Sequence, residues 1–109
     1  MAKIPNGAKF IIDLPGDPTL TLREPTIEEM NHYHGRRLEV PANATKEQAA
    51  LVYQVAQIEL FDLLLTEVTG LEDDKDQPIG VDRKHLIPAV WKTQAIFQRF
   101  DSSPVMLKN

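Results

Sequence analysis

Residues 19–29, Thr-Leu-Thr-Leu-Arg-Glu-Pro-Thr-Ile-Glu-Glu, contain the change of hydrophobic period that decides the fold. The first five residues alternate polar and apolar side chains, which is typical of a strand that lays Leu20 and Leu22 on a core. The proline ends that strand. Thr26, followed three residues later by Glu29, has the form of a capping box and predicts the start of a helix.

A second strand is predicted just upstream of this stretch. Residues 8–13, Ala-Lys-Phe-Ile-Ile-Asp, are rich in β formers. The Pro-Gly and Asp-Pro pairs within residues 14–18 favour a turn, so the two strands are expected to form an antiparallel hairpin. Because a lone hairpin is marginal in water, its apolar face must lie on the helices that follow.

Three helices are predicted after the hairpin. The first covers residues 27–38. The second begins at another capping box, Thr45 with Gln48, and covers residues 46–69, a run of good helix formers without glycine or proline. The third covers residues 82–100 with a kink near Pro88, because proline lacks the amide donor and clashes with the preceding turn. We therefore expect an α+β fold in which an N-terminal antiparallel β-hairpin packs on three α-helices.

Length and composition indicate one globular domain over residues 1–109. The chain is 42% hydrophobic and 26% charged, which is ordinary for a packed protein of this size. Residues 1–7 and 102–109 are expected to be frayed ends. Residues 71–81 are expected to form a mobile acidic loop, since they combine acidic side chains with Pro78 and Gly80.

Composition also excludes several classes of function. The chain has no cysteine, which rules out disulfides, thiolate metal sites and a thiol nucleophile. A net charge of -4 argues against nucleic acid as a partner. The longest apolar stretch, residues 60–65, is interrupted by Asp62 and is too short to span a membrane. The N-terminus lacks the apolar core of a signal peptide, so we expect a cytoplasmic protein without a membrane partner.

No metal or cofactor site is predicted. His32 and His34 fall on different faces of the first predicted helix, and no third imidazole or thiolate lies close in sequence. The acidic loop does not match a calcium-binding EF-hand. A loop that starts at Asp74 places Ile79 where glycine is required and His85 where glutamate is required.

Catalytic residues are not predicted either. The chain has neither a Gly-x-Ser-x-Gly nucleophile elbow nor a glycine-rich phosphate loop. Asp82 and His85 could form an orienting pair, but at a helix start the same spacing is more simply a cap and a first-turn side chain. We therefore expect a protein that binds other proteins and is not an enzyme.

The second predicted helix carries the clearest sign of a binding surface. Residues 60–65 are apolar almost all round, so either the rest of the fold encloses them or part of them contacts another chain. On the third helix, Trp91 lies on a different face from Phe97 and Phe100. Core packing is favoured for the two phenylalanines, whereas Trp91 is equally suited to a partly exposed anchor. The candidate protein-binding residues are Leu60, Phe61, Leu64, Leu65 and Trp91.

The segment Leu22-Arg23-Glu24-Pro25-Thr26 resembles the opening of the small tail assembly chaperones of long-tailed bacteriophages, in the Mu-like and P2-like group. In that group a strand and turn lead into this motif, then into an acidic helix start and a mostly helical remainder. The resemblance covers residues 10–29. It implies a protein of the host cell cytoplasm, absent from the finished virion, that binds the helical tape measure protein while tail tube subunits polymerise around it.

The resemblance has one further consequence. Such chaperones often also exist in a frameshifted, C-terminally extended form, and Lys108-Asn109 is compatible with a slippery codon pair.

The alternative hypothesis is a small adaptor or regulatory module of phage or prophage origin, which would form a homo-oligomer through the second helix. That module would recognise a protein partner through Trp91 and through the segment of residues 78–109, which carries a net positive charge.

Overall fold

The computed structural model describes residues 9–13, 16 and 18–101, and its contacts divide the chain into two compact units. The first unit joins the described residues before Pro25 to Leu64–Pro88. The second joins Pro25–Leu63 to the described residues from Ala89 onward. The expected frayed ends, residues 1–7 and 102–109, lie outside the described residues.

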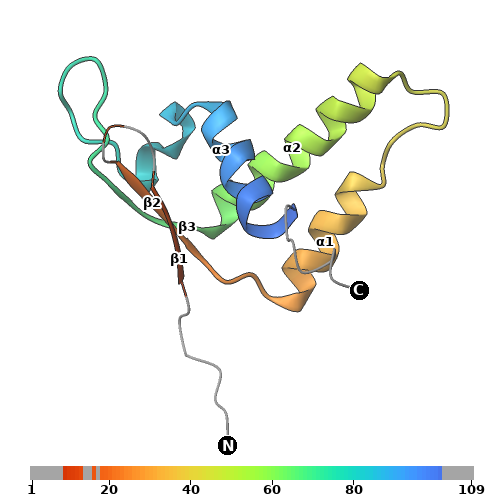
Figure 1. Cartoon of the computed structure of the whole chain (residues 1–109), viewed down its shortest axis with the longest axis horizontal. Coiled ribbons are helices and arrows are strands. Elements are labelled where there is room, and N and C mark those ends of the chain that lie inside the picture. The colour runs from red at the N-terminus through yellow and green to blue at the C-terminus, as the bar shows by residue number, and fades with distance from the viewer. Residues whose placement is uncertain (1–8, 14–15, 17, 102–109) are drawn as a thin grey trace, which may run out of the picture. The chain divides into compact units, whose positions relative to one another are not determined.

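The first unit contains a three-stranded antiparallel sheet (Figure 1). Strand β1, Lys9–Asp13, pairs with β2, Thr19–Arg23, which confirms the expected hairpin. Gly16 in the connection has a φ of 89°, in the left-handed region that favours glycine. Leu20 and Leu22 are both fully buried, as their alternation predicts.

The third strand replaces the end of the second predicted helix. Helix α2 ends at Leu64, and Leu65–Thr69 forms β3, which pairs antiparallel with β2 and has an irregularity opposite Thr21 and Leu22. The expectation that the helix continues to residue 69 is therefore wrong. The segment has three β-branched side chains among its five residues, and the edge of β2 that β1 does not use pairs with four of the five.

The acidic segment after β3 is a hydrogen-bonded loop. The Asp73 carboxylate accepts hydrogen bonds from the backbone amides of Lys75 and Gln77 at 2.8 and 2.9 Å. Its second oxygen accepts one from the Arg83 guanidinium at 2.6 Å. The hydrogen bond from Arg83 and, to a smaller extent, those from the two amides lower the pKa of Asp73. Arg83 belongs to the 3-10 helix η1, Val81–Leu86, so one carboxylate ties the loop to η1.

The second unit begins with two capped helices, α1 (Ile27–Arg37) and α2 (Lys46–Leu64). The Thr26 hydroxyl accepts from the Glu29 amide at 3.1 Å, and the Glu29 carboxylate accepts from the Thr26 amide at 2.9 Å. Thr45 and Gln48 form the same reciprocal pair at the start of α2. Both capping boxes predicted from sequence are thus present.

The chain breaks at Pro88, as expected, between η1 and helix α3 (Ala89–Ile96). The expected continuation to residue 100 is a π-helical turn, η2 (Phe97–Asp101), which alters the side-chain period at the end of α3. Phe97 is 49% exposed as a result, so the prediction that it packs in the core is wrong. Phe100 is half-buried.

Candidate functional site

Four of the five candidate binding residues are buried within the chain itself. The exposed fractions are 3% for Leu60, 0% for Phe61 and Leu64, and 5% for Leu65. Trp91 is half-buried on α3. Residues 60–65 were expected either to be enclosed by the rest of the fold or to contact another chain. The structure supports the first interpretation for these four side chains. A partner could reach little of these four side chains in the folded protein, so a docking surface must be sought among their neighbours.

A row of exposed apolar side chains follows one side of α2. Leu51, Val55 and Leu63 are 59%, 44% and 49% exposed. Together with Glu59 they recur every four residues, and this is the spacing of the ridges by which helices pack on one another. We call Leu51, Val55, Glu59 and Leu63 the α2 ridge. Exposed leucine and valine at this spacing offer apolar surface to a second helix.

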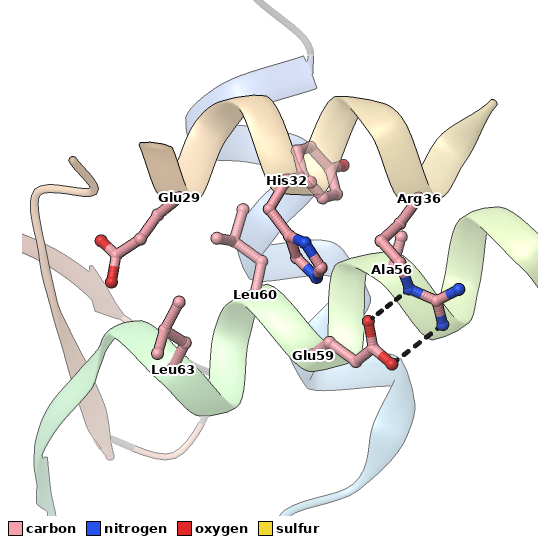
Figure 2. Close-up of a pocket in the computed structure, with 8 residues that line it drawn as sticks. Glu29, His32, Arg36, Ala56, Glu59, Leu60 and Leu63 are labelled. Atoms are coloured by element: carbon pink, nitrogen blue, oxygen red, sulfur yellow. Dashed lines mark hydrogen bonds and ion pairs between the residues drawn. The ribbon is translucent and has the colours of Figure 1, made fainter. Parts of the chain in front are cut away.

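Beside the ridge lies a groove between α1 and α2 with a volume of about 260 Å³ (Figure 2). In the close-up the two helices run in opposite directions, and His32 points from α1 towards α2. Leu60 and Leu63 face α1 from the other wall. The residues that line this α1–α2 groove are Glu29, His32, Tyr33, Arg36, Ala56, Glu59, Leu60 and Leu63.

Charged side chains close one end of the groove. The Arg36 guanidinium donates two hydrogen bonds to Glu59, each 3.0 Å long, and one of 2.7 Å to Glu39. The hydrogen bonds from Arg36 hold the pKa of the Glu59 carboxyl below its usual range. Because the pair is exposed to solvent, its contribution to stability is small, and its main effect is to hold the two side chains in place at this end of the groove. Glu29 lies at the opposite end (Figure 2).

The floor of the groove is held by Tyr33, which is 2% exposed. The Tyr33 hydroxyl donates to the Asp101 carboxylate at 2.6 Å. Asp101 also accepts from Gln57 at 3.2 Å and from Arg37 at 3.3 Å. One carboxylate at the end of η2 therefore holds α1 and α2 together beneath the groove. We call Tyr33, Arg37, Gln57 and Asp101 the Asp101 cluster.

The Asp101 cluster predicts a loss of stability at alkaline pH. Burial first, and then the hydrogen bond to Asp101, raise the pKa of Tyr33 above its usual value. The folded state therefore favours the neutral phenol, whereas tyrosine in the unfolded chain ionises near pH 10, at roughly its reference value. The contribution of Tyr33 is complete below about pH 10 and is lost as the pH rises further, by up to about 1.4 kcal/mol per pH unit.

Urea unfolding at about pH 9 and pH 11 measures this effect, since the two values bracket the reference pKa of tyrosine. The difference in unfolding free energy should be smaller in Tyr33→Phe, whereas Tyr53→Phe, which removes the other tyrosine, should keep the wild-type difference. Lysine ionisation is common to all three proteins and cancels in the comparison. Equal pH dependence in wild type and Tyr33→Phe would contradict the prediction.

The described residues show neither a metal cluster nor a membrane-spanning helix. No group of three His, Asp or Glu side chains in that part of the chain is placed to hold a metal ion. None of the described helices is both long and apolar enough to cross a membrane. His32, considered above as a possible ligand, instead lines the groove near the Arg36–Glu59 pair.

Of the groove residues, only Leu60 is among the binding residues predicted from sequence, and the others were missed for an identifiable reason. Leu63 lies inside the apolar run of residues 60–65, but nothing in that run distinguishes it from its buried neighbours. The four-residue spacing of Leu51, Val55 and Leu63 was a usable signal. It could be interpreted only once the buried side of α2 was known.

In comparisons with known proteins, no family model matches the chain, and neither does any curated protein or solved structure.

Proposed function

We propose that this chain is a non-catalytic phage tail assembly chaperone that binds the helical tape measure protein in the α1–α2 groove and along the α2 ridge. The observation that carries the proposal is the exposed α2 ridge, which lies beside the α1–α2 groove with its apolar floor. Such a surface is suited to binding an amphipathic helix. The sequence resemblance over residues 10–29 supports the choice of partner. The site chemistry agrees with a binding role, because its charged groups are already engaged with one another.

The geometry suits a helix whose apolar side chains recur every three or four residues. Each leucine-sized side chain that becomes buried in the groove would contribute about 1.5–3 kcal/mol. The Arg36–Glu59 pair at one end and Glu29 at the other can exchange hydrogen bonds with polar groups of the partner and so fix its direction. A binder of this kind can release its cargo when tail subunits compete for the same apolar face.

The test is co-purification of the chain with the tape measure protein encoded in the same gene cluster. Wild type should form a complex, and Leu63→Asp should weaken it by at least about tenfold, which is 1.4 kcal/mol. Leu63 is 49% exposed, so the variant should still fold. The matched control is Leu86→Asp, because Leu86 is 42% exposed on η1, outside the proposed surface.

Each outcome of this experiment has a definite meaning. A complex that survives Leu63→Asp, or that Leu86→Asp weakens equally, would overturn the proposed surface. A wild-type homodimer that Leu63→Asp dissociates, with no tape measure complex, would favour the adaptor function instead. In that case the α2 ridge would pair two copies of this chain.

A further inference from the structure

A second hollow lies between the C-terminal end of α1, the N-terminal part of α2 and the segment of residues 38–45 that connects them. It has a volume of about 460 Å³ and shares no lining residue with the α1–α2 groove. Its walls are largely apolar, and Leu38 and Tyr53 remain 80% and 42% exposed. We call it the connection hollow. Its lining residues are Arg37, Leu38, Val40, Lys46, Ala49, Ala50 and Tyr53.

The charged side chains that line the connection hollow have one sign. Arg37 and Lys46 line it, and no acidic side chain does. Arg37 is held in place by stacking, since its guanidinium carbon lies 4.9 Å from the ring centroid of Tyr53 and 5.3 Å from that of Tyr33. A guanidinium carries several N–H donors, and the bond to Asp101 at 3.3 Å uses one of them, so Arg37 retains donors for another acceptor.

Lys46 adds a second positive group. It is exposed at the first residue of α2 and makes no side-chain hydrogen bond or ion pair with another described residue. The partial positive charge at a helix N-terminus has the same sign as the lysine and adds to its field, whereas the carboxylate of Glu47 in the same turn opposes it. Glu39, the nearest carboxylate along the chain from Leu38, is already bonded to Arg36.

From this arrangement we infer that the connection hollow binds an acidic, apolar protein segment. An apolar side chain of the segment lies against Leu38, Ala50 and Tyr53, and a carboxylate within one helical turn of it meets Arg37 and Lys46. The occupant is assigned by charge complementarity, because two cations flank an apolar hollow that contains no carboxylate. The inference does not rest on the proposed function, since the two surfaces have no lining residue in common.

Two synthetic helical peptides test the inference. One carries leucine on one face and glutamate on the other, and the second has lysine in place of every glutamate. With the full chain, the glutamate peptide should shift the backbone amide resonances of residues 37–53 in nuclear magnetic resonance titrations. It should bind at least about tenfold more tightly than the lysine peptide, and its affinity should fall as salt is raised.

Charge reversal at one position provides the decisive variant. Lys46→Glu should lower the affinity for the glutamate peptide by about tenfold. The fold should survive, because a carboxylate is favourable in the first turn of a helix. Lys75→Glu, an equal charge change at an exposed position in the acidic loop, should leave the affinity unchanged.

The same titration separates this site from the α1–α2 groove. Leu63→Asp should leave the glutamate peptide bound, although it is expected to disrupt the tape measure complex. Equal binding of the two peptides would overturn the inference, and so would equal losses in Lys46→Glu and Lys75→Glu. Loss of the glutamate peptide in Leu63→Asp would place it in the groove and would also overturn the inference.

Discussion

Phe61→Ala is expected to lower the free energy of unfolding by about 3–5 kcal/mol, the usual cost of removing a fully buried phenylalanine ring. Phe61 is 0% exposed, so the substitution leaves a cavity in addition to losing the transfer free energy of the ring. The ring also lies 5.8 Å from the ammonium of Lys92, which is 5% exposed and donates to Asp62 at 2.8 Å. Loss of the ring therefore also disturbs an ion pair whose lysine is buried and whose carboxylate is partly exposed.

Urea unfolding followed by Trp91 fluorescence measures this change. The matched control is Leu63→Ala, two residues further along the same helix, where 49% exposure should limit the cost to about 1 kcal/mol. If the two variants lost equal stability while Phe61→Ala abolished partner binding, Phe61 would be an interface residue. The core position described above would then be wrong.

Asp101→Ala is expected to lower the free energy of unfolding by about 2–4 kcal/mol, because three donors lose one shared acceptor. The Tyr33 hydroxyl is the most affected, since its ring is 2% exposed and water cannot readily replace the carboxylate. Arg37 would lose its ion pair with Asp101. The end of η2 would then be free to separate from α1 and α2, and the floor of the groove would loosen.

A double-mutant cycle identifies the cause of this loss. Tyr33→Phe and Asp101→Ala each remove one end of the 2.6 Å hydrogen bond, so their effects should add to more than the effect of the double variant. Asp101→Asn, which keeps an acceptor but removes the charge, should lose less stability than Asp101→Ala. Strictly additive single effects would show that Asp101 does not act through Tyr33.

Local patterns in the chain predicted much of the backbone correctly. The β1–β2 hairpin, both capping boxes and the break at Pro88 depend on residues a few positions apart, and each is present. Alternation of period two placed Leu20 and Leu22 in the core for the same reason. Hydrogen bonds and steric limits within a turn act whatever the rest of the chain does, so the sequence alone reveals them.

Features that join distant residues could not be found in this way. No glycine or proline ends the helix pattern before residue 69, but residues 65–69 pair with residues of β2 that lie 43 to 50 positions earlier, and local propensity does not reveal that ladder. The partners of Asp101 precede it by 44 to 68 residues. The Arg36–Glu59 pair crosses from one helix to another.

The same division applies to the candidate site. The composition of residues 60–65 shows that this run carries more apolar surface than one helix face needs. Which of those side chains stay exposed depends on packing between segments that are distant in the chain. It buries Leu60, Phe61, Leu64 and Leu65 and leaves Leu63 exposed beside α1. Burial depends on what packs against each side chain, and a run that is apolar on every side cannot encode that choice locally.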